Sequence, residues 1–160
     1  MNSPLAERMR PKKLDDFIGQ EHLVGPKGVL ASYKDQNLIP SLLFWGPPGV
    51  GKTTLAQLIA KDRPFQQLSA IESGVKEVRA VIQQAKRQDS LFTSQKRTVL
   101  FIDEIHRFSK SQQDALLGAV EKGWITLIGA TTENPSFEVI PALRSRCQLY
   151  ILEPLTKEHL

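Results

Sequence analysis

The sequence predicts an α/β domain in which short apolar strands alternate with amphipathic helices. A glycine-rich segment, GPPGVGKT at residues 46–53, joins the apolar run 41–45 to a helical pattern over 54–61. A second apolar run, 98–102, ends in a pair of carboxylates. A strand, a glycine-rich loop and a helix in this order are typical of α/β folds that bind phosphates.

Length and composition suit one domain. The chain has 160 residues, of which 41% are hydrophobic, and this is enough to bury a core. Its single cysteine, Cys147, excludes an internal disulfide, and no long apolar run indicates export or a membrane span. We therefore expect a cytoplasmic protein that does not bind membranes. The formal net charge of +4 is compatible with nucleic acid as a partner but does not by itself indicate one.

The glycine-rich segment fits the phosphate-binding pattern G-x-x-x-x-G-K-[ST], the P-loop or Walker A motif. Its backbone N–H groups must wrap a polyphosphate, and glycines permit the curvature and the close approach that this needs. The helix that begins near Gly51 directs its positive dipole end at the same phosphates. Lys52 is a compact charge for the β- and γ-phosphates, and the Thr53 hydroxyl is a ligand for Mg²⁺.

The acidic pair after the run 98–102 fits the Walker B pattern. Asp103, at the end of a buried strand, is expected to hold Mg²⁺, usually through water. Glu104 is then placed to polarise a water for attack on the γ-phosphate. Carboxylates at strand ends also cap helices, but the P-loop upstream favours the catalytic interpretation. We interpret His106 as an ordinary polar residue.

The rest of the chain continues the alternation of strands and helices. A capping box formed by Ser109 and Gln112 predicts the start of a helix that ends near Gly123. The other expected strands are 65–69, 124–129 and 147–152, and the other expected helices are 29–37, 74–88 and 137–143.

Two polar segments in the last third of the chain are candidates for contacts with the γ-phosphate. If strand 124–129 lies between the two Walker strands, Thr132 would face the γ-phosphate, with Asn134 as the second choice. The alternative is a turn without such a role. Arg144 and Arg146 are either solvated surface residues or include an arginine finger that reaches a neighbouring subunit's γ-phosphate. In the second case activity requires an oligomer.

Together these motifs resemble an AAA+ ATPase of the clamp-loader clade. More narrowly, the chain resembles the replication-associated recombination protein A family (RarA or MgsA), whose eukaryotic relative is the Werner helicase-interacting protein. The similarity is carried by PLAERMRP at 4–11, IGQEHLVG at 18–25, FIDEIHRF at 101–108, KSQQD at 110–114 and GATTENPSF at 129–137. It covers nearly the whole chain.

The resemblance implies a three-layer αβα P-loop NTPase fold with a parallel five-stranded sheet of order 5-1-4-3-2. It also implies a DNA-dependent ATPase that uses ATP and Mg²⁺. Such an enzyme would act at stalled replication forks and single-/double-stranded DNA junctions, in replication-coupled recombination and repair. The implied partners are DNA, further copies of the chain (a tetramer in the full-length family) and the single-stranded DNA-binding protein. The implied location is the nucleoid.

Residue roles follow the family's pattern. The resemblance assigns Glu104 as the catalytic base, Thr132 as sensor 1 and Arg146 as the finger. The implied metal ligands are Thr53 and Asp103. The implied nucleotide-binding residues are Gly46, Pro47, Pro48, Gly49, Val50, Gly51, Lys52, Thr53 and Thr54, with Arg10, Pro11, Ile18 and Gly19 on the adenine side.

The family continues into a helical lid with a second sensor arginine and then a tetramerisation domain. We expect an N-terminal arm with a helix over residues 1–37, the ATPase core over 38–153 and the start of the lid over 154–160. On this basis the chain corresponds to an N-terminal fragment. Such a fragment is expected to hydrolyse ATP weakly or not at all by itself.

Other functions remain open at this point. A clamp-loader subunit and a RuvB-like Holliday-junction branch-migration ATPase share the motifs. A small-molecule kinase also uses a P-loop, but the paired Walker B carboxylates and the lack of an evident acceptor site oppose it. A nucleotide-binding scaffold without turnover would owe its inactivity to the missing lid, since every expected catalytic residue is present.

Overall fold

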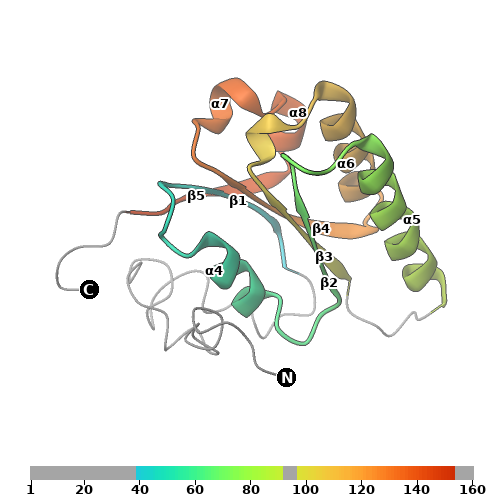
Figure 1. Ribbon diagram of the computed structural model, residues 1–160. Coiled ribbons are helices and arrows are strands. Elements are labelled where there is room, and N and C mark those ends of the chain that lie inside the picture. The colour runs from blue at the N-terminus through green and yellow to red at the C-terminus, as the bar shows by residue number, and fades with distance from the viewer. Residues whose placement is uncertain (1–38, 92–96, 154–160) are drawn as a thin grey trace.

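The computed structural model describes residues 39–91 and 97–153, and these residues confirm the predicted three-layer α/β fold (Figure 1). One sheet contains the strands β1 (Ser41–Trp45), β2 (Phe65–Ser69), β3 (Thr98–Asp103), β4 (Ile125–Thr131) and β5 (Cys147–Ile151). Their order is β2-β3-β4-β1-β5, which is the predicted order 5-1-4-3-2 read from the opposite edge. Every pairing between neighbours in the sheet is parallel.

Helices cover both faces of this sheet. On one face lies α4 (Lys52–Ile59), and on the other lie α5 (Val75–Leu91) and α6 (Lys110–Glu121) (Figure 1). Three shorter helices follow the ends of β3 and β4: η2 (Ile105–Arg107), α7 (Pro135–Glu138) and α8 (Pro141–Arg144). None of the helices in the described ranges is long and apolar enough to cross a membrane.

Each face of the sheet has its own apolar core, because successive residues of a strand point to opposite faces. In β3, Val99 and Phe101 pack with α4, whereas Leu100 and Ile102 pack with α5 and α6. All four side chains are fully buried. A parallel strand that is buried on both faces is apolar along its whole length, and this is why the run 98–102 could be recognised from sequence.

The predicted capping box at the start of α6 is confirmed. The Ser109 hydroxyl accepts a hydrogen bond from the Gln112 backbone N–H at 3.2 Å, and the Gln112 side chain accepts one from the Ser109 N–H at 2.9 Å. The Gln112 amide also donates to the Ser73 carbonyl at 3.1 Å. The cap therefore also ties α6 to the segment that precedes α5.

The single helix predicted over 137–143 is wrong, because the structure divides this segment into α7 and α8. Val139 between them is extended, with φ −108° and ψ 133°. Pro141 begins α8, and a proline disfavours the helical conformation in the residue before it. The Asn134 side chain caps α7 by accepting a hydrogen bond from the Ser136 N–H at 2.9 Å.

A buried glutamine fixes the break between these two helices. Gln113 of α6 is 3% exposed, and its amide nitrogen donates to the carbonyls of Phe108 and Glu138 at 3.1 and 3.0 Å. Its amide oxygen accepts from the Ile140 N–H at 2.8 Å. The side chain thereby satisfies the Glu138 carbonyl and the Ile140 N–H, which the helix break leaves without helical partners.

We predict that Gly129→Ala lowers the free energy of unfolding by about 1–3 kcal/mol, the usual cost of overpacking a core. A Cβ atom at Gly129 in β4 would lie 2.8 Å from Leu43 Cδ2 and 2.9 Å from Ile105 Cδ1. Both neighbours are buried and have little room to move. Chemical denaturation of the wild type and the variant measures the difference.

Gly118→Ala in α6 is the matched control. A Cβ atom there would meet no atom within 4 Å beyond its chain neighbours and the backbone of its own helix. Alanine is favoured over glycine inside a helix by roughly 0.5–1 kcal/mol, so this variant should be as stable as the wild type or more so. Equal stabilities of the two variants would contradict the packing argument.

Candidate functional site

The candidate site lies where three neighbouring strands end. β1 ends at Trp45, directly before the P-loop, while β3 ends at Asp103 and β4 ends at Thr131. β4 pairs with both β1 and β3, which is the arrangement on which the prediction for Thr132 depended. Open α/β sheets bind ligands outside the carboxyl ends of their strands, and this is such an edge.

A cavity of about 270 Å³ opens at this edge. It is lined by Pro48, Gly49, Gly51, Lys52, Thr53, Thr54, Asp103, Glu104 and Thr132. All of these were singled out from the sequence, and they come from three separate segments: the P-loop with the start of α4, the end of β3, and the residue after β4. The fold thus gathers both Walker motifs and the predicted sensor around one hollow.

Glycines set the shape of the P-loop. Gly51 has φ +90°, a left-handed conformation that other residues rarely adopt, and α4 begins at the next residue. A Cβ atom at Gly46 would lie 2.7 Å from the Leu152 carbonyl oxygen, so only glycine fits there. The Gly46 N–H donates to the Thr131 carbonyl at 3.1 Å, and the Leu152 N–H donates to the Trp45 carbonyl at 2.8 Å.

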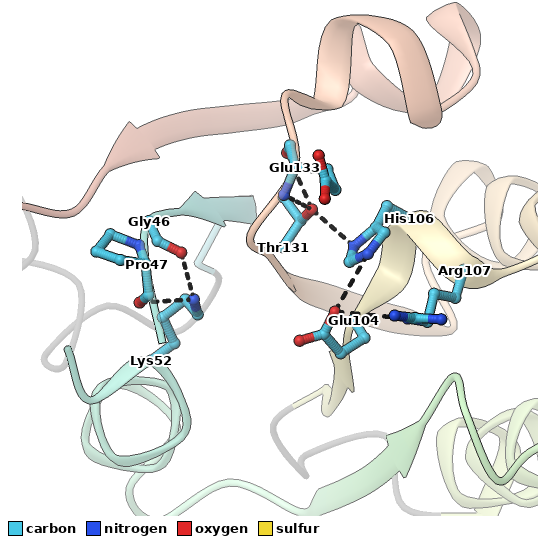
Figure 2. A network of polar contacts seen from close by, with 8 residues as sticks. All are labelled: Gly46, Pro47, Lys52, Glu104, His106, Arg107, Thr131 and Glu133. Atoms are coloured by element: carbon cyan, nitrogen blue, oxygen red, sulfur yellow. Dashed lines mark hydrogen bonds and ion pairs between the residues drawn. The ribbon is translucent and has the colours of Figure 1, made fainter. Parts of the chain in front are cut away.

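Lys52 is held by its own loop. Its ammonium donates to the carbonyl oxygens of Gly46 at 2.6 Å and Pro47 at 3.1 Å (Figure 2). Burial lowers the pKa of Lys52, while the carboxylates of Asp103 and Glu104 oppose that shift by attracting the charged form. A bound phosphate would offer Lys52 anionic oxygens, which are stronger acceptors than these carbonyls.

Glu104 stands at a sharp turn between β3 and η2. Its backbone has φ 58° and ψ 44°, a left-handed conformation that is uncommon outside glycine and often found at functional sites. Its carboxylate oxygen Oε2 lies 3.2 Å from Nε2 of His106 and 3.9 Å from Nε of Arg107 (Figure 2). The turn places the carboxylate in the lining of the cavity, beside Asp103.

His106 does not line the cavity, but this residue, interpreted from the sequence as an ordinary polar residue, contacts one that does. Its Nε2 contacts Glu104, and its Nδ1 lies 2.9 Å from the Thr131 hydroxyl (Figure 2). It therefore joins the end of β3 to the end of β4. The only signal in the sequence was its position in the same turn as Glu104, because its other partner lies 25 residues further on.

Some predicted residues lie elsewhere. Arg146 is outside the cavity lining: its side chain is 54% exposed and its Nη2 lies 4.0 Å from the Glu121 carboxylate. Its role as a finger concerns a neighbouring subunit and stays a prediction. Asn134 caps α7, and Val50 is buried in the core beside α4. The adenine-side residues Arg10, Pro11, Ile18 and Gly19 lie outside the described residues.

The donor set of the cavity suits Mg²⁺. The described part of the chain contains no group of three or more His, Cys, Asp or Glu residues that could bind a metal by themselves. Mg²⁺ does not require one, because it usually keeps several waters and binds substrate phosphates with only one or two protein oxygens. Thr53 and Asp103 both line the cavity and supply oxygens of this kind.

Comparisons with known proteins identify the family of the chain. The sequence profile of the ATPase family associated with various cellular activities (AAA) matches residues 42–155. The chain belongs to the AAA family. The predicted resemblance to replication-associated recombination protein A is also confirmed. This AAA protein is 49% identical over 157 residues to that protein of Escherichia coli K12, a match that covers 97% of this chain and 34% of the relative.

Two further similarities extend this result. ATPase WRNIP1 of Dictyostelium discoideum is 51% identical over 160 residues, which is 99% of this chain and 18% of that protein. A solved structure of a RuvB variant from Thermotoga maritima has a TM-score of 0.70 and 35% identity, over 91% of this chain and 48% of that one. The AAA protein described here thus spans about a third of its bacterial relative.

Proposed function

We propose that this AAA protein is a DNA-dependent ATPase that acts at stalled replication forks and single-/double-stranded DNA junctions, in replication-coupled recombination and repair. The proposal rests above all on the cavity in which Lys52, Thr53, Asp103, Glu104 and Thr132 meet. The names of the relatives, replication-associated recombination protein A and WRNIP1, support the biological setting. The partners that we propose are DNA and further copies of the chain. The location that we propose is the cytoplasm.

In this proposal each residue of the cavity has its own role in ATP hydrolysis. The P-loop N–H groups and the start of α4 bind the polyphosphate, and Lys52 neutralises its outer phosphates. Mg²⁺, held through Thr53 and Asp103, would supply positive charge that stabilises the phosphate oxygens. Glu104 accepts a proton from the attacking water, whose oxygen bonds to the γ-phosphorus as the bond to the β-phosphate oxygen breaks. The Thr132 hydroxyl hydrogen-bonds to the γ-phosphate.

A second candidate function is branch migration of Holliday junctions. It is favoured by the similarity to RuvB, which extends over 91% of this chain. The two functions differ in the DNA that each enzyme would recognise. They can therefore be separated by the structure of the DNA that stimulates ATP hydrolysis.

We predict that a forked DNA stimulates steady-state ATP hydrolysis by the complete protein more than single-stranded DNA of the same sequence does. A four-way junction assayed in parallel is the comparison for the RuvB-like function. Residues 1–160 alone should bind ATP and respond weakly or not at all. Sound ATP binding without stimulation by any DNA would instead favour a clamp-loader-like subunit that depends on protein partners.

We predict that Glu104→Gln retains ATP binding but lowers the rate of hydrolysis by roughly 10²–10⁴-fold, the usual contribution of a general base. Lys52→Ala should instead weaken ATP binding at least about tenfold, because hydrogen bonds to charged groups contribute ~1.5–3 kcal/mol. Titration with a fluorescent ATP analogue and single-turnover hydrolysis measure the two quantities separately.

Lys61→Ala and Glu72→Gln are matched controls for this pair. Both residues are exposed and outside the cavity lining, so neither change should affect binding or hydrolysis. Loss of ATP binding in Glu104→Gln would mean that this residue has a structural role. Unchanged turnover in Lys52→Ala would refute the assignment of the site.

We predict that Arg146→Ala lowers turnover in the complete protein, because the arginine acts on the γ-phosphate of a neighbouring subunit. Mixing this variant with Glu104→Gln subunits should partly restore hydrolysis, since one interface then holds an intact base and an intact finger. Glu121→Gln, which removes only the ion-pair partner, should keep its turnover. No restoration on mixing would argue against a finger that acts between subunits.

A further inference from the structure

The Glu104 carboxylate is anchored through one oxygen. Among the described residues, its polar contacts to His106 and Arg107 both involve Oε2. Figure 2 shows the other oxygen turned away from these two residues, toward the side on which Lys52 lies. Glu104 and Lys52 line the same cavity. One oxygen is thus anchored, while the second has neither of these contacts and lies on the side of Lys52 (Figure 2).

His106 is the stronger of the two anchors. Its Nε2 lies 3.2 Å from Oε2 and its side chain is only 10% exposed. Arg107 is 3.9 Å away and 60% exposed, and an exposed ion pair at that distance restrains a carboxylate weakly. The orientation of Glu104 therefore depends mainly on the imidazole.

The other ring nitrogen connects this anchor to the end of β4. The Thr131 hydroxyl has a single proton, yet it lies 2.9 Å from His106 Nδ1 and 3.0 Å from the Glu133 carbonyl oxygen. If the hydroxyl donates to Nδ1, the neutral imidazole carries its proton on Nε2 and donates it to Glu104. If the hydroxyl donates to Glu133, Nδ1 must be the donor, and only an imidazolium can then also donate to Glu104.

In the first arrangement the Thr131 hydroxyl fixes the tautomer whose Nε2–H donates to Glu104. Thr131 is 1% exposed, and its hydroxyl also accepts from the Glu133 N–H at 2.9 Å, so it is a fixed part of the turn after β4. The next residue, Thr132, lines the cavity. A shift of the turn at Thr132 would therefore also move the Thr131 hydroxyl that contacts His106.

We propose that His106 is a positioning residue for hydrolysis, which holds Oε2 of Glu104 and links its orientation to the turn at Thr131 and Thr132. It does not line the cavity and acts only through Glu104. The inference rests on the proposed function, in which Glu104 is the base.

Three substitutions of His106 separate its two contacts. In His106→Gln the amide nitrogen reaches the place of Nε2 and still donates to Glu104, whereas in His106→Asn the amide reaches only the place of Nδ1 beside Thr131. His106→Ala removes both contacts. The kcat, the KM and the dissociation constant for a fluorescent ATP analogue are measured in the complete protein, and circular dichroism checks folding.

We expect His106→Ala and His106→Asn to lower kcat about tenfold or more, since a misoriented base loses part of a contribution of ~10²–10⁴-fold. KM and the dissociation constant should stay within roughly twofold of wild type, because the P-loop contacts are unchanged. His106→Gln should keep most of the wild-type kcat. Thr131→Val combined with His106→Ala should be no slower than His106→Ala alone, because both act on one contact chain.

The proposal is overturned if His106→Ala has the wild-type kcat, or if kcat and nucleotide affinity fall together. Equal kcat values for His106→Gln and His106→Asn also overturn it, and this comparison decides the matter if His106→Ala fails to fold.

The variant Glu104→Gln distinguishes a failure of the proposed base from a failure of the proposed role of His106. If that variant hydrolyses ATP at the wild-type rate, the proposed base and this inference both fail. If it is inactive while the His106 variants are normal, only this inference fails.

Discussion

The placement of β4 between β1 and β3 is the constraint on which the rest of the site depends. β4 is buried along its whole length and pairs with both neighbours in parallel. Parallel pairing brings the carboxyl ends of all three strands to one edge, so the P-loop, the Walker B carboxylates and Thr132 meet without any long excursion of the chain. An antiparallel β4 would send Thr131 to the opposite edge, away from Lys52. The strand order is thus a chemical requirement as well as a packing arrangement.

Two kinds of contact hold the functional groups in place at this edge of the sheet. Backbone groups fix the P-loop: the N–H of Gly46 binds the carbonyl at the end of β4, and Lys52 is held by the carbonyls of its own loop. Side chains fix the carboxylate: the left-handed turn at Glu104 aims it at the cavity and His106 restrains one of its oxygens. Backbone groups thus hold the phosphate-binding loop, and side chains hold the carboxylate of Glu104.

Much of this could be predicted from the sequence because the signals are local. A sequence pattern of ten residues or fewer is enough to recognise the P-loop, the capping box and each strand that is buried on both faces. The break between α7 and α8 was missed because the apolar residues around Val139 fit a helix, although Pro141 prevents one. The contact between His106 and Thr131 could not be predicted from the sequence, because the two residues follow or end different strands that become neighbours only in the folded sheet.

The packing of Gly46 against Leu152 has a mechanical consequence. Leu152 is 1% exposed, its N–H is bonded to the last residue of β1, and its carbonyl leaves no space for a side chain at Gly46. The polypeptide that continues beyond residue 152 is thus attached to the first residue of the phosphate-binding loop. Because the two residues are packed in direct contact, a displacement of Leu152 would also displace Gly46, and a displacement of the loop at Gly46 would also displace Leu152.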